Sequence, residues 1–158
     1  MKDGEGPGPI EPIPLRNLMR VKVRDIMNKM PPTISPKASI DDLLEYMRRE
    51  IENCFLVVDE DQKLLGIVTE SDIFQIFYPG IPRATIGSVF REIAKTKART
   101  VGEIMTKRPI TATPEMRVTD ALKLMAEHKL RRLPVVEGGK LVGLLSLRDI
   151  VELYRLLR

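Results

Sequence analysis

The sequence predicts a mixed α/β (α+β) fold built from two similar repeats, each running strand or extended segment, helix, strand, strand, helix. Two observations predict it. The segment 66–73 (GIVTESDI) returns as 143–150 (GLLSLRDI), and the segment 23–27 (VRDIM) returns as 101–105 (VGEIM). Such self-similarity at a nearly fixed spacing is typical of a duplicated unit. Two units in one chain can pair their sheets and cover each other's apolar faces.

Both copies of the glycine motif predict a buried strand that runs directly into a helix. A hydroxyl residue, Thr69 or Ser146, follows the apolar run, and an aspartate, Asp72 or Asp149, stands three places later. The positive N-terminal end of a helix favours an acidic residue, and the pattern also fits a capping box. Because the motif occurs twice, each time with a glycine at the end of the strand, we expect a ligand site in addition to a cap.

An amphipathic helix is predicted after each Pro-x-Thr segment, because apolar residues recur there at spacings of three and four. Ser39 and Asp42 are expected to cap the first of these helices. The apolar face consists of Ile40, Leu43, Leu44 and Met47 in the first repeat, and of Val118, Ala121, Leu122 and Met125 in the second.

Short apolar runs at 55–58 and 133–136 predict strands. The turn after the second run contains Gly138 and Gly139, which can adopt the positive φ that a tight hairpin needs. That turn is one residue shorter than its counterpart, so the offset between the repeats falls there from 78 to 77 positions. A length change at a hairpin tip is tolerated in a duplicated fold.

The chain divides into four expected segments. Residues 1–20 form a Gly- and Pro-rich arm, and residues 21–79 form the first repeat. Residues 80–99 form a connector with an amphipathic helix at 88–95, and residues 100–158 form the second repeat. Gly and Pro favour extended or turning backbone, which sets the arm apart from the body.

The composition indicates a soluble chain of mixed surface charge. The 158 residues are 43% hydrophobic and 30% charged, with a formal net charge of +4, which suffices for one compact core or for two small halves that share one. A single cysteine, Cys54, and a single histidine, His128, exclude a disulfide framework and a Cys/His zinc cluster. No apolar run reaches the length of a membrane span and the N-terminus lacks signal-peptide features, so we expect a cytoplasmic protein.

These ordered features resemble a tandem pair of CBS domains, the cystathionine-beta-synthase motif often called a Bateman module, over about residues 21–154. Each feature occurs twice: Val-x-(Asp/Glu)-Ile-Met, Pro-x-Thr, an amphipathic helix, an apolar hairpin and Gly-x-x-(Thr/Ser)-x-x-Asp. The resemblance implies two CBS repeats paired about a pseudo-twofold axis, as sheets flanked by helices. It also implies regulation by AMP, ADP, ATP or S-adenosylmethionine, bound in clefts between the repeats, without catalytic residues, catalytic cofactor or metal.

The resemblance assigns ligand-binding residues by position. Asp72 and Asp149 are expected to accept hydrogen bonds from ribose hydroxyls, while Thr69 and Ser146 are expected near a phosphate; carboxylates and helix N-termini suit these roles. The remaining positions are Thr33, Ile34, Thr111 and Ala112 at the adenine, Phe55, Leu56, Leu133 and Pro134 in the apolar walls, and Arg131, Arg132 and Arg148 at the phosphate.

The two repeats differ in charge around these positions. Asn53 and Cys54 stand where the second repeat has the arginine pair 131–132, and Ser71 stands where that repeat has Arg148. We therefore expect the cleft that uses Asp149 to bind more tightly, unless a cleft borrows arginines from the other repeat.

Two other functions stay open. Basic residues crowd the connector and the segment after it, as in a nucleic-acid-binding protein, although acidic residues interrupt them. A dimerisation module whose clefts hold no ligand is the second alternative. An enzyme is not expected, because the sequence has neither a Walker loop nor a dinucleotide fingerprint. His128 is typical of a solvated helix residue, and Cys54 of a small core residue.

The helices after the two glycine motifs are more apolar than one sheet can bury. Ile73, Phe74, Ile76 and Phe77 follow the first motif, and Ile150, Val151, Leu153, Tyr154, Leu156 and Leu157 follow the second. Because monomers rarely expose large apolar patches, we expect a homodimer built through these helices and those that start near Ile40 and Val118. No effector domain is expected in the sequence, so the regulated target protein would be a separate chain.

Overall fold

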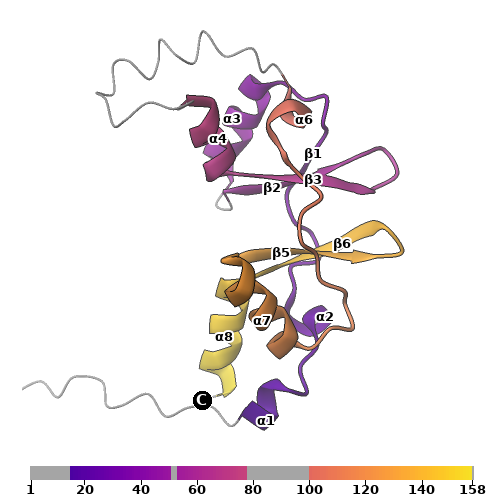
Figure 1. The fold of residues 1–158 in the computed structure, drawn as a ribbon, viewed down its shortest axis with the longest axis vertical. Helices are drawn as coiled ribbons and strands as arrows, with labels where there is room; N and C mark the ends of the chain where they lie inside the picture. Colours follow the sequence, from indigo (N-terminus) through magenta and orange to yellow (C-terminus); the bar gives the residue numbers. More distant parts are fainter. Residues whose placement is uncertain (1–14, 51–52, 78–99, 158) are drawn as a thin grey trace, which may run out of the picture.

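The structure is a computed structural model that describes residues 15–50, 53–77 and 100–157. Two bodies lie one above the other, each with a sheet on its inner side and helices further out (Figure 1). The connector helix predicted at 88–95 lies outside the described residues. The helices are α1 (Leu15–Leu18), α2 (Val23–Ile26), α3 (Ile40–Arg49), α4 (Glu70–Phe77), α6 (Val101–Ile104), α7 (Val118–His128) and α8 (Leu147–Leu157). The strands are β1 (Thr33–Ile34), β2 (Cys54–Val58), β3 (Leu64–Thr69), β4 (Thr106–Lys107), β5 (Arg132–Glu137) and β6 (Lys140–Ser146).

The larger sheet contains four strands in the order β1-β2-β3-β4. β1 runs parallel to β2, whereas β2 pairs with β3 and β3 with β4 in antiparallel fashion. The other sheet is the antiparallel pair β5-β6, and Ala112 adds a parallel bridge to Val135. Each sheet therefore carries the hairpin that the apolar runs predict.

The helices and hairpin turns predicted within the described residues after the Pro-x-Thr segments and the glycine motifs are confirmed, with one change of face. Ser39 caps α3 by accepting the Asp42 N–H at 3.0 Å, and Gly138 and Gly139 have φ of 58° and 80° in the second hairpin. Leu122, which was assigned to the buried face of α7, is instead 37% exposed. Among the described residues, no helix has the length and apolar character needed to cross a membrane.

The segment at the start of each repeat forms a one-turn helix, α2 or α6, rather than the extended segment expected there. The carboxylate of Asp25 accepts the backbone N–H of Lys22 at 2.9 Å, which caps α2. Lys22 and Met27, which flank α2, are extended, and the first strand of the first repeat is β1. Four residues carry too little periodicity to separate a helical turn from a strand.

Each of these short helices packs on the body of the other repeat. Val23 of α2 is fully buried in the core that contains Val118 and Leu133, and its N–H donates to the Met116 carbonyl at 2.9 Å. Val101 of α6 is buried in the core of the first repeat. The sequence repeats and the compact bodies therefore do not coincide, because the two repeats exchange their leading segments.

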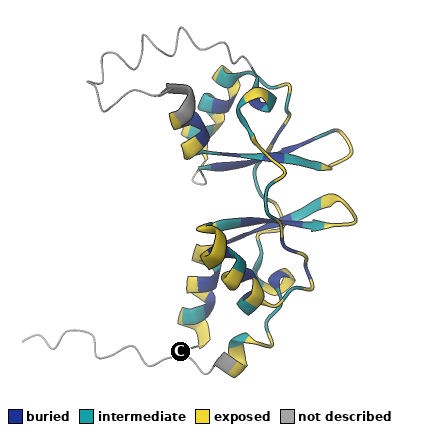
Figure 2. Cartoon of the chain, viewed as in Figure 1, coloured by how far each residue is buried: buried dark blue, intermediate teal, exposed yellow. Residues whose placement is uncertain are grey.

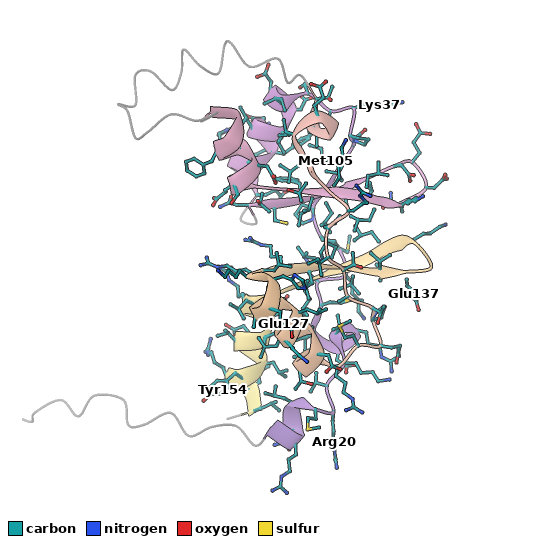
Figure 3. All side chains as sticks on the ribbon, viewed as in Figure 1. Arg20, Lys37, Met105, Glu127, Glu137 and Tyr154 are labelled. Atoms are coloured by element: carbon teal, nitrogen blue, oxygen red, sulfur yellow. The ribbon has the colours of Figure 1, made fainter. Side chains whose placement is uncertain are left out.

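The motif glycines make this exchange possible. A Cβ atom on Gly66 would lie 2.7 Å from both the sulfur of Met105 and the carbonyl oxygen of Thr106. A Cβ atom on Gly143 would lie 2.7 Å from the sulfur of Met27. Figure 3 shows Met105 on the connection that runs through the upper body. The glycine in each motif thus leaves room for a segment of the other repeat.

The exchange is reciprocal. Thr106 pairs with Ile67, and Asn28, which occupies the position equivalent to Thr106, forms a bridge with Leu144. A contact in one half therefore has an equivalent contact in the other half, as a twofold axis requires. The two halves are therefore related by the predicted pseudo-twofold symmetry.

The two sheets meet through a small apolar cluster. Cys54 and Leu56 of β2 and Leu144 of β6 are each at most 2% exposed and pack together. Figure 2 shows buried positions along the strands of both sheets. Cys54 is therefore the core residue that the sequence predicts, and this cluster holds the two bodies at a fixed separation.

Candidate ligand cleft between the two bodies

The first glycine motif ends β3 and begins α4 around a buried carboxylate. Asp72, which is 7% exposed, accepts the backbone N–H of Thr69 at 2.8 Å through Oδ2. Its other oxygen accepts the hydroxyl of Thr106 at 2.8 Å. Thr106 belongs to β4 of the second repeat, so both repeats supply hydrogen bonds to this carboxylate. The predicted capping role of Asp72 is confirmed.

The second motif forms a more local arrangement. Asp149 accepts the Ser146 N–H at 2.7 Å through Oδ2, and its own N–H donates to the Ser146 hydroxyl at 3.2 Å. This reciprocal pair is a capping box. Asp149 is only partly buried, and no other hydrogen bond reaches its carboxylate among the described residues.

A cavity of about 510 Å³ lies between the bodies beside the first motif. Its volume falls within the range of small-molecule sites. The first repeat contributes Asn53, Ile67, Thr69, Glu70 and Ser71 to its wall, and the second contributes Thr106, Arg108, Pro109, Ile110, Lys129, Leu130, Arg131, Arg132 and Pro134. Nitrogen-tipped side chains gather in Figure 3 at the end of β5 nearest α7, toward the other sheet.

The cavity brings together four of the predicted site residues: Thr69, Arg131, Arg132 and Pro134. The arginine pair therefore lies with the first motif and not with Asp149, to which the sequence comparison had assigned it. This placement removes the arginine pair as a reason for expecting the Asp149 cleft to bind more tightly and leaves Arg148 as the remaining one. Two repeats that face each other across a twofold axis present their strand ends to segments of the opposite repeat.

Asp72 itself lies behind the cavity wall, because its hydrogen-bond partners Thr69 and Thr106 are wall residues. A carboxylate has about four lone-pair sites, so a ligand hydroxyl that reaches Asp72 has to share Oδ1 with the Thr106 hydroxyl or displace it.

The other predicted residues lie elsewhere. Thr33, Ile34 and Phe55 line a separate groove of about 380 Å³ beside β1. Leu56 lies between the sheets, and Leu133 and Ala112 are buried in the core of the second body. Thr111 is exposed, Ser146 is 8% exposed at the end of β6, and Arg148 is exposed at the start of α8.

The pseudo-symmetric counterpart of the cavity is only partly described. Lys129 and Leu130, which line the first cleft, correspond through the offset of 78 to positions 51 and 52. Those two positions lie outside the described residues. Of the two predicted clefts, the structure therefore defines the one beside Thr69.

The cavity contains residues that the sequence reasoning did not select. Lys129 stands two positions before Arg131, so the basic run around the arginine pair was a signal that could have included it. Thr106 and Arg108 gave no such signal, because only the exchange of leading segments brings them to the first motif. Ile67 of the first repeat and Ile110 of the second repeat add apolar surface to the wall of the cavity.

Residues 23–78 and 101–156 each match the CBS domain. The chloroplastic CBS domain-containing protein CBSX1 of Arabidopsis thaliana is 31% identical over 134 residues, covering 75% of this chain and 57% of that protein. The chain thus spans little more than half the length of that relative. The uncharacterized protein MJ1426 of Methanocaldococcus jannaschii is 31% identical over 150 residues, covering 82% of this chain and 89% of that protein. An inosine-5'-monophosphate dehydrogenase of Korarchaeum cryptofilum is 33% identical over 130 residues, covering 81% of this chain but 22% of that enzyme.

Solved structures match the same fold. The crystal structure of CBSX2 in complex with AMP superposes with a TM-score of 0.71 at 29% identity, covering 85% of this chain and 96% of that one. The CBS domain pair of protein MJ0100, in complex with 5'-methylthioadenosine and S-adenosyl-L-methionine, gives a TM-score of 0.68 at 27% identity, covering 87% and 98%. The predicted CBS-pair architecture is confirmed.

Proposed function

Since this chain belongs to the CBS domain family, we propose that it is a regulatory module that binds an adenosine nucleotide in the cleft between its two bodies. The observation that carries the proposal is the cavity that joins Thr69, at the end of β3, to Arg131 and Arg132 of the other repeat. A strand end, a helix start and two guanidinium groups are the groups that hold a phosphorylated ligand.

The cavity wall offers a place for each part of such a ligand. Ile67, Ile110 and Pro134 supply apolar surface for the base. The arginines and the N-terminus of α4 suit the phosphate. For the ribose we propose Asp72, whose Oδ1 would exchange the Thr106 hydroxyl for a ribose hydroxyl. Hydrogen bonds from a ligand to an ionised carboxylate are among the stronger ones.

The ligand class that we propose is AMP, ADP, ATP or S-adenosylmethionine. The solved complexes of CBSX2 with AMP and of MJ0100 with S-adenosyl-L-methionine support this class. We propose that occupancy reports an energy or metabolite state to a target protein that is a separate chain. The cytoplasmic location stays a prediction from composition.

Thermal unfolding with each nucleotide tests the proposal. At a ligand concentration about one hundred times Kd, binding adds roughly 2.7 kcal/mol, which should raise Tm by several degrees. Melting curves that do not move with millimolar AMP, ADP, ATP or S-adenosylmethionine would contradict it and favour a dimerisation module without ligand. The same titration with a DNA or RNA oligonucleotide, repeated at higher salt, checks the nucleic-acid alternative.

We also propose that the module is a homodimer. An apolar groove of about 530 Å³ runs between α3 and α4 and is lined by Leu44, Met47, Ile73 and Phe74 among others. Phe74 is 64% exposed, which is unusual for a phenylalanine of a helix beside a core. A second copy related by a twofold axis can insert its own α4 at this surface.

Light scattering at micromolar concentration tests the dimer. We expect twice the chain mass of 18.0 kDa for the natural sequence and a shift toward monomer for Phe74→Asp. Lys140→Asp, at the exposed tip of the second hairpin and outside the helices expected in the interface, is the control. A natural chain that scatters as a monomer, with and without nucleotide, would refute the dimer.

A further inference from the structure

The cleft beside the first motif is strongly cationic. Its wall contains four basic side chains, Arg108, Lys129, Arg131 and Arg132, and one acidic side chain, Glu70. The formal charge of the wall is therefore four positive against one negative. A cleft wall whose charge is mostly of one sign concentrates the potential and attracts ligands of the opposite sign.

Three of these cations are not neutralised by the protein. Arg108, Lys129 and Arg131 are exposed, and within the described residues no carboxylate lies at salt-bridge distance from any of them. Their charge is therefore available to a ligand.

Two of the cations stand on unusual backbone. Arg108 has φ of 50° and Lys129 has φ of 54°, and they are two of the three residues other than glycine with positive φ in the described part of the chain. Lys129 terminates α7, where a left-handed residue is common but glycine is preferred. Strained backbone at a cleft wall points to function, because glycine would satisfy either turn at lower cost.

A single phosphate group does not need this many cations. Arg131 and Arg132 suffice for a monophosphate, since each guanidinium can hold two oxygens. Arg108 and Lys129 approach the same cavity from β4 and from the end of α7, and so extend the positive wall beyond the arginine pair. A chain of two or three phosphates carries the additional charge that matches them.

We propose that the cleft selects adenosine ligands by their number of phosphates, preferring the di- and triphosphate to AMP and to the cationic S-adenosylmethionine. Arg108 and Lys129 are the residues that set this preference. The proposal rests on the nucleotide-binding function proposed above and adds the ligand class. Neither residue belongs to the duplicated motif. Arg108 reaches the cleft only because the segment that contains β4 is exchanged between the repeats.

Calorimetric titration of AMP and ATP, at one ionic strength and without divalent cations, tests the preference. In the natural sequence we expect ATP to bind about tenfold or more tightly than AMP. Arg108→Gln and Lys129→Gln should each weaken ATP binding about fivefold to tenfold and change AMP binding less than about twofold. Lys123→Gln, on the exposed face of α7 and one turn or more from the cavity wall, is the matched control and should change neither.

Conservative variants separate charge from folding. Arg108→Lys and Lys129→Arg retain the cation, so they should keep most of the preference for ATP if charge is its cause. Equal affinity for AMP and ATP in the natural sequence, or an ATP to AMP ratio unchanged in both glutamine variants, would overturn this inference while leaving nucleotide binding intact. If no adenosine ligand binds at all, the proposed function and this inference both fail.

Discussion

The two glycine motifs share a sequence pattern and a strand-to-helix turn, but their aspartates have different surroundings. Asp72 is 7% exposed and accepts hydrogen bonds through both oxygens. Asp149 is partly exposed and closes a capping box with Ser146 alone. The difference comes from the residue that the opposite repeat supplies: Thr106 reaches Asp72, whereas Asn28, in the equivalent position, accepts the N–H of Met30 instead.

A cleft in this duplicated fold is formed by both copies. The motif in one repeat fixes the strand end and the start of the helix. The charge and the hydroxyl groups that face it come from the other repeat. Two clefts with the same motif can therefore have different ligand chemistry. Substitutions that alter one contribution should therefore affect the two halves differently.

The largest effect is expected where the exchanged segments cross. Gly66→Ala should destabilise the protein by about 3 kcal/mol, because the new Cβ would meet the sulfur of Met105 and the carbonyl oxygen of Thr106, both at 2.7 Å. A backbone oxygen cannot rotate away as a side chain does. Urea denaturation gives the free energy of unfolding.

Gly143→Ala is the matched variant in the other half. Its nearest backbone oxygen, that of Asn28, is 2.9 Å from the new Cβ, so we expect a slightly smaller loss. A neutral Gly66→Ala would show that β4 does not pass over the first motif.

The two aspartates should differ in their contribution to stability. Asp72→Ala leaves the Thr69 N–H and the Thr106 hydroxyl without their acceptor in a buried place, which should cost about 2 kcal/mol. Asp149→Ala removes one helix cap and should cost about 1 kcal/mol. Thermal and urea unfolding measure both. Equal losses, or a larger loss for Asp149→Ala, would mean that Thr106 adds nothing to the first motif.

The smallest effect concerns an ion pair that only one half possesses. Glu115, before α7, pairs with Lys22 and Arg24 near α2, whereas its counterpart in the first repeat is Lys37. The hydrogen bond from Lys22, and the charge of Arg24, hold the pKa of the Glu115 carboxyl below its usual value of 4.5. The lowered pKa stabilises the folded state at pH values above the ordinary pKa of the carboxyl. This contribution is lost as the pH falls through the folded-state pKa.

Glu115→Gln should therefore lower Tm slightly near neutral pH, and this difference should shrink as the pH falls through the folded-state pKa of the natural carboxyl. Glu60→Gln, at the tip of the first hairpin, is the control, because no basic side chain lies at salt-bridge distance from Glu60 in the described part of the chain. A Tm difference that grows as the pH falls would have the wrong sign for this ion pair.

The sequence predicted the fold well because the repeat preserved its periodic patterns. The helical face around Leu43, the glycines of the second hairpin and the cap of α3 by Ser39 are local features, and local residues determine them. The exchange of α2 and α6 is not local. It depends on Val23 and Val101 packing in the opposite core, and no pattern within one repeat specifies which core receives them.

The candidate site was predicted in part for the same reason. Thr69 and Asp72 were found from the motif, and Arg131 and Arg132 from the basic run, but the sequence left open which of the two motifs the arginine pair faces. Assigning arginines to a cleft requires the relative position of the two bodies, which the apolar contact of Cys54, Leu56 and Leu144 sets.

The position of the nucleotide is tested most directly by the affinity of two single variants for ADP, measured by calorimetry. If the nucleotide lies in the cavity formed by the first motif and the arginines of the second repeat, Arg131→Ala should weaken binding by about tenfold or more. Arg148→Ala, beside the second motif, should then change the affinity by less than about twofold. The opposite result, a loss of affinity with Arg148→Ala and none with Arg131→Ala, would place the ligand at Asp149 and contradict the proposed site beside the first motif.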